Sequence, residues 1–550
     1  MKKNIIIYSL TLLMGLSGCS LDAFPGSDII TEEQKDEILS KNPDSFIAEI
    51  NALSANLIKY NTLESSGIHF DYGYAAVCMI YDTSGMDLVS DNVGYNWYNS
   101  TLSFRDRLDT SINTKFIWRV FYNNIKVSND ILVNINGMLE TTTDPSQIAA
   151  LENYKGQALA HRAFGYLNLV QAYQFTYKGH EDAPAVPLKL TLDDERYNAT
   201  RATVSEVYDV ILSDLNESIE LLKDKKRASE AKDKVSVQVA YGLRARVNLV
   251  MNNWKAAAED AQKAQEGFTP LSIDAVSKPG FNSAKNDSWM WANLITEEND
   301  IVATGIINWP SHLCSFTGNG YTVGTQTYRR INQPLWDEIP ENDIRKHWWV
   351  DEEKKAPYVD EIKFPTSQGE MPLVDYLGWD SFTNLKFGAY NNEILNPMNA
   401  SDWVMMRVEE MILIEAEAKA MSGDLEGGKS VLANFLKTYR NPGYVTSKAT
   451  SAEDFQTEVW KERRVELWGE GFALFDLLRL KKPLERVKVA ADGKKLTTYG
   501  PTVSFNTDPE AQILLFLIPE SEIEANTSLS KADNNPTAEV PKPMELKIKE

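Results

Sequence analysis

The sequence has few of the residues that hold metals, cofactors or disulfide frameworks. Its 550 residues include five histidines and three cysteines, and no two histidines have the His-x-x-x-His or His-Glu-x-x-His spacing of a metal site. The two cysteines beyond Cys19 are too few for a disulfide framework. A bridge between Cys78 and Cys314 is one alternative, and two small buried thiols are the other. The sequence therefore predicts neither a metal nor a cofactor.

Positive charge and long apolar runs are also scarce. The formal net charge is −22, which argues against nucleic acid as a partner and against electrostatic attraction to anionic lipid. Beyond the first 18 residues, no stretch approaches the ~20 consecutive apolar residues of a transmembrane helix. The charge balance suits a neutral or cationic ligand, or serves solubility alone.

The N-terminus has the order of an export signal. Lys2 and Lys3 precede a mostly apolar run, 5–16, that is too short to span a bilayer. The run ends in Leu-Ser-Gly-Cys, which resembles a bacterial lipobox and would make Cys19 the lipid-modified first residue of the mature chain. The alternative is an ordinary secretory signal that contains a cysteine. We expect residues 1–18 to be a signal peptide and residues 19–40 to be a lipid anchor and tether.

Helical periodicity dominates both ends of the mature chain. Apolar residues recur at helical spacing in the segments 43–60, 115–139, 146–177, 204–223, 237–252, 254–266, 403–421, 425–439 and 452–480. Between them, residues rich in Gly, Pro, Asn and aromatics include strand-like fragments such as 300–307. The sequence predicts a mainly α fold in which tetratricopeptide-like hairpins form a scaffold. Its parts are a helical region (41–267), a loop-rich lobe with short strands (268–400), and a C-terminal helical region with a surface tail (401–550).

Residues 423–430, GDLEGGKS, match the nucleotide-binding P-loop literally. A working P-loop follows a strand and opens a helix, whereas Gly423 follows a predicted helix. The surrounding hairpin aligns with the hairpin at 237–266 at a constant offset of 171 residues, with Gly423 on Asn252. We interpret the segment as the turn of a second helical hairpin, with Gly423 ending one helix and Gly428 at the contact between helices. No nucleotide binding is expected.

Four blocks of the mature chain carry a family likeness. They are CSLDAFP (19–25), YKGQALAHRAFGYLNLVQAYQF with AVPL (154–188), RVEEMILIEAEAKAMSGDLEGGKSVLANF (407–435), and WKERRVELWGEGFALFDLLRLKKP with LFLIPESEIEAN (460–526). They resemble the SusD/RagB family of Bacteroidetes outer-membrane lipoproteins, and the block 460–483 is the most specific. The resemblance covers essentially the whole mature chain. It implies a lipid-anchored, surface-exposed protein that captures a nutrient for a SusC-like TonB-dependent transporter, without catalysis.

Charged residues of the block 460–483 invite a second interpretation, because paired carboxylates can hydrolyse glycosidic bonds. They are Arg463, Arg464, Glu466, Glu470, Asp476 and Arg479. Three- and four-residue spacing is, however, typical of ion pairs that brace helices, and no histidine or cysteine nucleophile accompanies them. We interpret the block as scaffold and keep a glycosidase as an alternative.

Two segments combine aromatic rings with amide side chains, as a sugar-binding surface requires. The loop near 82–100 offers Asp91, Tyr95, Asn96, Trp97 and Tyr98 as ligand-binding candidates. The segment 308–328 offers Trp309 and Tyr321, together with His312, Asn319 and Tyr328, and its glycine-rich run 318–324 suggests a flexible rim. In the resembled family the ligand face is built from these same two regions. Weaker alternatives are Trp289, Trp291, Trp348 and Trp349. Any of these rings can instead pack the core.

The sequence thus predicts an oligosaccharide-binding lipoprotein of the outer membrane. Within the same family, a peptide ligand is the alternative. From another class, the alternative is a helical-repeat scaffold for an envelope complex that binds no small ligand.

Overall fold

The computed structural model describes residues 46–65, 67–90, 95–191 and 198–544. The signal peptide, the predicted lipidation site Cys19 and the candidate Asp91 lie outside the described residues, so the expectations for them stay predictions. In the described part of the chain, no helix combines the length and the apolar character needed to cross a membrane.

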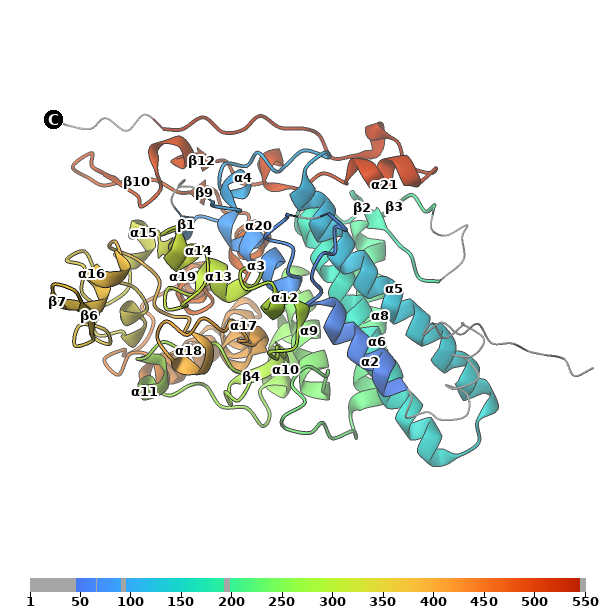
Figure 1. The fold of residues 1–550 in the computed structure, drawn as a ribbon. Coiled ribbons are helices and arrows are strands. Elements are labelled where there is room, and N and C mark those ends of the chain that lie inside the picture. Colours follow the sequence, from blue (N-terminus) through green and yellow to red (C-terminus); the bar gives the residue numbers. More distant parts are fainter. Residues whose placement is uncertain (1–45, 66, 91–94, 192–197, 545–550) are drawn as a thin grey trace, which may run out of the picture.

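The described chain is mainly helical, as the sequence predicts. Its longer helices are α2 (Phe46–Asn56), α3 (Tyr74–Thr83), α5 (Ile112–Thr141), α6 (Pro145–Tyr173), α8 (Val204–Leu222), α9 (Val237–Val250), α10 (Trp254–Ala264), α17 (Val408–Met421), α18 (Leu425–Tyr439), α19 (Ala452–Glu466) and α20 (Ala473–Arg479). Helix α6 packs between α5 and α8, and α2 lies along α5. Figure 1 shows these four helices on one side of the molecule, with the loop-rich lobe opposite and the C-terminal residues along one edge.

Polar side chains set the starts of the long helices. Ser111 accepts a hydrogen bond from a backbone N–H in the first turn of α5, and Asp144 does so for α6, which also begins with Pro145. Thr203 and Glu206 form a reciprocal capping box at the start of α8. Such caps satisfy backbone donors that have no partner within the helix, which explains why the predicted and observed starts agree closely.

The two helical hairpins adopt equivalent turns. Asn252, between α9 and α10, has a φ of 61°, and Gly423, between α17 and α18, has a φ of 102°. Both residues therefore end their helices in the left-handed region. A Cβ on Gly428 would lie 2.5 Å from the backbone oxygen of Ala416, so only glycine allows α18 to approach α17 this closely. The two predicted hairpins are therefore confirmed, and they also pack on each other through α10 and α17.

Short elements make up the loop-rich lobe and the connections. The strands are β1 (Leu88–Ser90), β2 (Pro184–Pro187), β3 (Arg201–Thr203), β4 (Trp289–Asn293), β5 (Arg329–Ile331), β6 (Lys363–Thr366), β7 (Gly369–Pro372), β8 (Trp403–Arg407), β9 (Leu484–Glu485), β10 (Lys488–Val489), β11 (Lys495–Leu496) and β12 (Asn506–Thr507). Within the described residues they form two-stranded antiparallel pairs: β1 with β5, β2 with β3, β4 with β8, β6 with β7, β9 with β12, and β10 with β11. The short helices are α4 (Asn99–Leu102), α11 (Ile273–Val276), α12 (Asp300–Ala303), α13 (Trp309–Leu313), α14 (Tyr321–Gly324), α15 (Gln333–Trp336), α16 (Leu373–Leu377) and α21 (Glu520–Ala525).

Three local predictions were wrong. The helix expected from residue 403 begins at Val408, because residues 403–407 instead pair with β4 as strand β8. The helix expected over 452–480 is broken between α19 and α20, where Gly469 and Gly471 have positive φ. The strand expected within 300–307 is the short helix α12. The apolar runs in the first and third cases fit either structure, so tertiary contacts decide, whereas in the second case the backbone conformation of the two glycines breaks the helix.

Cys78 and Cys314 are both free and buried, so the alternative of a bridge between them is wrong. Burial raises the pKa of each thiol. Both residues act as small hydrophobic side chains of the core.

Candidate functional site

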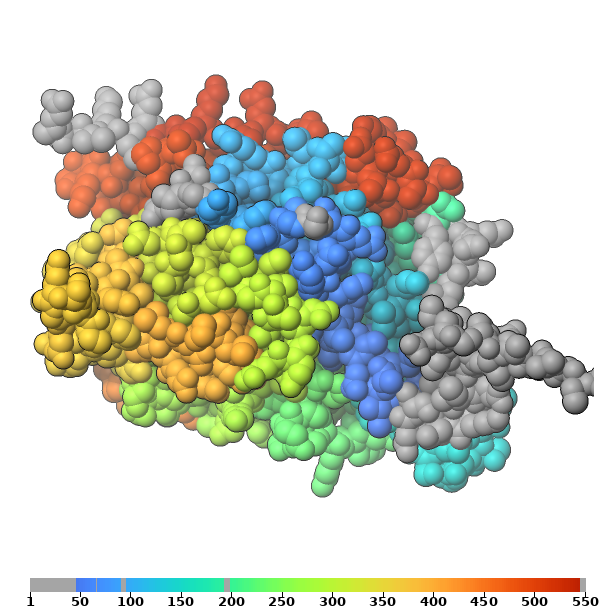
Figure 2. All heavy atoms as spheres, viewed as in Figure 1, coloured from blue at the N-terminus to red at the C-terminus, as the bar shows by residue number. Residues whose placement is uncertain are grey.

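The two predicted ligand segments lie side by side. Strands β1 and β5 pair so that Ser90 faces Arg329. The amide of Asn96 donates to the Ser90 hydroxyl at 2.8 Å and accepts from the Arg329 guanidinium at 3.2 Å. Asn96 is therefore tied to the last residue of β1 and to the first residue of β5. In the space-filling view, the yellow-green surface of the region around α13 and α14 adjoins the blue surface of the first described residues (Figure 2).

Seven aromatic side chains meet at this junction, and we call them the aromatic cluster. They are His69, Tyr72, Tyr95, Trp97, Tyr98, His312 and Tyr321. Three of them form a column: the ring centroids of Tyr72 and His312 are 5.4 Å apart at 17°, and those of His312 and Tyr321 are 4.8 Å apart at 24°. The column is rooted in the core, since His312 is 0 % exposed and Tyr72 is 2 % exposed.

The outer rings of the aromatic cluster reach solvent. Trp97 is half-buried and stacks on His69, which is also half-buried, with centroids 4.7 Å apart at 16°. Tyr95 is 67 % exposed and leans against Tyr321, with centroids 6.4 Å apart at 48°. Partly exposed flat rings backed by a second ring can receive the C–H face of a sugar.

The histidines of the aromatic cluster are held neutral. The Nε2 of His312 donates to the backbone oxygen of His69 at 2.9 Å. Burial, with a smaller contribution from Arg329, lowers the pKa of His312 to about 3. Burial also lowers the pKa of His69, whose Nδ1 forms a hydrogen bond with the Tyr321 hydroxyl. At neutral pH the aromatic cluster therefore carries no histidine charge, which suits a neutral ligand.

Three candidate residues lie inside the protein and not on this surface. Tyr98 is 0 % exposed, and its hydroxyl lies 2.5 Å from that of Tyr72. Asn96 uses its amide to hold the loop, as described above. Trp309 is 1 % exposed, donates its N–H to the backbone oxygen of Ser401 at 2.8 Å, and packs against Trp403. Each of these side chains supports the site or the core in the described structure, and direct contact with a ligand stays a prediction for them.

The secondary candidates also have structural roles. Tyr328 donates to the backbone oxygen of Leu377 at 2.7 Å, and Asn319 donates to that of Gly305 at 3.2 Å. The four tryptophans regarded as weaker alternatives are buried, as predicted: Trp289, Trp291, Trp348 and Trp349.

Two glycines of the run 318–324 lie against neighbouring backbone, while the expected flexibility of this rim stays a prediction. A Cβ on Gly318 would lie 2.0 Å from the backbone oxygen of Leu395, and a Cβ on Gly320 would lie 2.4 Å from the Cα of Ser311. Glycine is required at both positions by close backbone approach. This packing fixes the start of α14 and with it the ring of Tyr321.

Sequence reasoning missed His69 and Tyr72. Both belong to the segment GIHFDYGY at 67–74, whose aromatic content was a usable signal. Its place beside 95–99 and 308–328 follows only from tertiary contacts.

The P-loop match has no phosphate site. The helix start that would have to face a phosphate is capped by the Asp424 carboxylate, which accepts from the backbone N–H of Gly427 at 3.0 Å. Lys429 pairs with Glu426 at 2.9 Å. A carboxylate already occupies the position that an anion would need.

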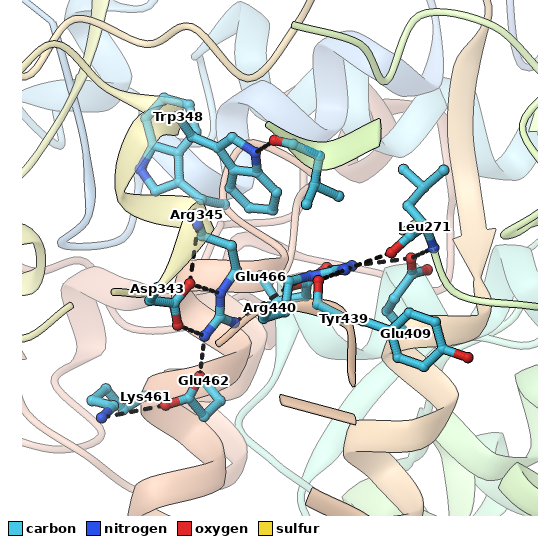
Figure 3. Close-up of polar contacts among 12 residues, drawn as sticks. Leu271, Asp343, Arg345, Trp348, Glu409, Tyr439, Arg440, Lys461, Glu462 and Glu466 are labelled. Atoms are coloured by element: carbon cyan, nitrogen blue, oxygen red, sulfur yellow. Dashed lines mark hydrogen bonds and ion pairs between the residues drawn. The ribbon is translucent and has the colours of Figure 1, made fainter. Parts of the chain in front are cut away.

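Glu466 and Glu470 of the block 460–483 join a buried ion network, whereas Arg463, Asp476 and Arg479 pair among themselves and with Glu417, and Arg464 pairs with Asp87. The carboxylate of Glu466, 0 % exposed, accepts from Arg440 at 2.8 Å through each oxygen, from Arg407 at 2.7 Å and from Arg345 at 3.3 Å. Figure 3 shows Arg345 between Asp343 and Glu462, and Arg440 reaching toward the backbone of Leu271. The network therefore joins α17, α18 and α19 to the loop-rich lobe.

These carboxylates are poorly placed for catalysis. Burial alone would raise the pKa of Glu466, but Arg440, Arg407 and Arg345 hold it well below its usual range. In the same way, Arg407 and Lys386 outweigh burial and lower the pKa of Glu470. A general acid needs a raised pKa and access to substrate, and these groups have neither. The predicted scaffold role of the block is therefore supported.

The chain is similar in sequence to known proteins of one family. The family description "Starch-binding associating with outer membrane" matches residues 52–249, and the "SusD family" matches residues 375–536. A SusD-like protein of Formosa agariphila is 22 % identical over 365 residues, covering 60 % of this chain and 67 % of its own.

Solved structures extend the likeness over most of the chain. A SusD-like carbohydrate binding protein of Bacteroides vulgatus is 26 % identical with a TM-score of 0.69, and the match covers 90 % of this chain and 98 % of that one. A SusD superfamily protein of Bacteroides thetaiotaomicron is 18 % identical with a TM-score of 0.68, covering 90 % and 99 %. The paired family matches at both ends and the shared fold show that the chain belongs to the SusD/RagB family.

Proposed function

We propose that this protein binds an oligosaccharide at the surface of the outer membrane and passes it to a SusC-like TonB-dependent transporter. The observation that carries the binding proposal is the aromatic cluster, in which Trp97 and Tyr95 present rings to solvent above a buried column. The family name associates such proteins with starch and the outer membrane, and the similar Bacteroides vulgatus protein is described as carbohydrate binding.

Trp97 is the proposed main anchor. Its ring is already ordered by stacking on His69, so little conformational freedom is lost when a sugar binds. Tyr95 is far more exposed. The conformational entropy that its side chain loses when a sugar binds offsets part of its contact energy. Asp91 remains a proposed hydrogen-bonding residue of the same loop.

The test is calorimetric titration with a glycan first identified on an array. Trp97→Ala should weaken binding by about 1–3 kcal/mol, as truncated aromatic hot spots do, and Tyr95→Ala should weaken it less. Tyr376→Ala is the matched control, because Tyr376 is 43 % exposed and stacks on Phe364 with centroids 5.0 Å apart. Circular dichroism checks that each variant folds. Wild-type affinity in a folded Trp97→Ala variant would refute the assignment.

The two alternatives make different predictions. A helical scaffold without a small ligand would show no thermal stabilisation by any glycan, since only a ligand of the folded state raises Tm. A peptide-binding member would be stabilised by oligopeptides and not by glycans. No catalysis is proposed, and intact glycan after prolonged incubation would agree with that.

The anchoring proposal rests on the Leu-Ser-Gly-Cys sequence that ends at Cys19. Cys19→Ala should leave the protein without a lipid and release it from the membrane fraction. Full membrane retention of this variant in cells without the transporter would contradict the lipid anchor.

A further inference from the structure

A cavity that shares no residue with the aromatic cluster lies in the helical region. It has a volume of about 260 Å³ and lies between α2, α6 and the connection from α8 to α9. Its walls include the buried apolar side chains of Ile50, Leu222 and Val235. This size is at the lower end for ligand pockets, so it suits one short apolar chain and not an oligosaccharide.

One polar group in this cavity lacks a partner. Gln157 lines the cavity and is 5 % exposed, yet its Oε1 accepts no hydrogen bond from any described residue. Its Nε2 reaches only Asn153, at 3.5 Å. A buried acceptor left unpaired is costly and uncommon in folded proteins. A ligand that brings an N–H or O–H group beside its apolar chain would remove that cost.

The rim of the cavity is cationic in an acidic protein. Residues 223–234 contain six basic residues and three acidic ones, giving +3 in a chain of net charge −22. Lys225, Lys226, Arg227 and Lys234 all line the cavity. Lys226 is exposed and has no ion pair among the described residues.

Of the other rim cations, Lys234 is paired with Asp233, and the remaining two are only partly engaged. Lys225 lies 3.6 Å from Glu152. Arg227 donates through one nitrogen to two backbone oxygens, both at 2.8 Å, which fixes the shape of the connection. Lys225, Lys226 and Arg227 also line a neighbouring hollow of about 570 Å³, so space for a head group exists beside the cavity mouth.

We propose that this cavity binds an anionic amphiphile: a molecule with one short apolar chain, a hydrogen-bond donor next to that chain, and an acidic head. The chain lies against Ile50, Leu222 and Val235, the donor meets Gln157 Oε1, and the acid lies between Lys225 and Lys226. This site shares no residue with the aromatic cluster, so it stands whether or not the glycan proposal does.

The experiment titrates the full mature protein at pH 7 with four ten-carbon probes. Decanoate, 3-hydroxydecanoate and decyl phosphate should bind, with the hydroxylated acid tighter than decanoate. Decyltrimethylammonium should bind at least about ten-fold more weakly than decyl phosphate, because charge-assisted hydrogen bonds are the stronger kind. Equal affinity for the cationic and anionic probes would overturn the proposal.

Three variants locate the site. Lys226→Glu should weaken the binding of decyl phosphate by at least about ten-fold. Lys437→Glu should not, because Lys437 is an exposed lysine of α18 outside the cavity. Gln157→Leu should abolish the preference for 3-hydroxydecanoate over decanoate, while the protein still binds decanoate. Val235→Trp should fill the cavity and abolish binding of all probes. Unchanged decyl phosphate affinity in a folded Lys226→Glu variant would refute the site.

A crystal structure with 3-hydroxydecanoate provides the last check. The chain should lie in the cavity with its hydroxyl at Gln157. A cavity filled by the protein's own residues ahead of Phe46 in the presence of the probe would overturn the proposal.

Discussion

The buried ion network and the aromatic cluster differ in charge and in exposure. In the network, Glu466 contacts three guanidinium groups and is 0 % exposed. In the aromatic cluster, the histidines are neutral and Tyr95 is 67 % exposed. The more charged region is therefore the structural one, and the uncharged region is the one open to a ligand.

This contrast follows from the cost of burying charge. An ion pair that has lost its water is stable only if every partner stays in place, so the network constrains the hairpins and the lobe to one arrangement. The aromatic cluster has no such requirement, because a ring loses little when one face remains in water. Charge density in a sequence is accordingly a poor guide to the ligand site of this protein.

The largest effect should come from removing one charge of the network. Glu466→Gln keeps the shape of the side chain but leaves Arg345, Arg407 and Arg440 with one anion fewer, so unfolding free energy should fall by about 3–5 kcal/mol. Glu426→Gln is the control, because the Glu426 side chain is 83 % exposed. This substitution should lower the unfolding free energy by under about 0.5 kcal/mol. Chemical denaturation measures both. Equal effects would show that the network does not hold the scaffold.

The two tryptophans first considered for binding should respond in opposite ways. Trp309→Ala should lower the unfolding free energy by about 3–5 kcal/mol, as large buried aromatics do, with glycan affinity unchanged at temperatures where the variant is folded. Trp97→Ala should lower affinity and leave stability nearly unchanged. Denaturation and titration of both variants give the comparison. A Trp309→Ala variant that is stable but fails to bind would return Trp309 to the site.

These cases show what the sequence could and could not predict. Long periodic helices and the turn at Gly423 were predictable, because spacing and backbone geometry are local properties. The strand at 403–407 was not, since its apolar run fits either structure until β4 pairs with it. Trp97 and Trp309 have similar local sequence surroundings, and only contacts with His69 and Ser401 separate surface from core. The partners of Glu466 come from distant segments and leave no local pattern.

Asp82 offers an intermediate case, a buried carboxylate with no cation in direct contact in the described structure. It accepts from the backbone N–H groups of Gly471 and Ala473, both at 3.0 Å, and burial raises its pKa to about 7. The folded state therefore holds a proton that the unfolded chain releases near pH 4, and this contribution to stability is lost as pH rises from about 4 through 7.

The measurement is the stability difference between wild type and Asp82→Asn across that range. The asparagine does not titrate, so the difference should shrink with rising pH by on the order of 4 kcal/mol. Glu466 should show the reverse, because its lowered pKa makes its contribution disappear only as pH falls below the usual carboxylate range. A difference for Asp82→Asn that is constant from pH 4 to 8 would contradict the raised pKa.

The smallest effect should come from the lysine of the P-loop match. Lys429 pairs with Glu426 and its side chain is 13 % exposed, so its stem covers some apolar surface, and Lys429→Ala should cost under about 1 kcal/mol. No ATP should bind to either form in equilibrium dialysis. The neighbouring Gly428→Ala provides the contrast: its Cβ would lie 2.5 Å from the Ala416 oxygen, and forcing the helices apart should cost about 1–3 kcal/mol. If instead Lys429→Ala were the more harmful change, or removed a measurable ATP affinity, the segment would be a nucleotide site and the hairpin interpretation would be wrong.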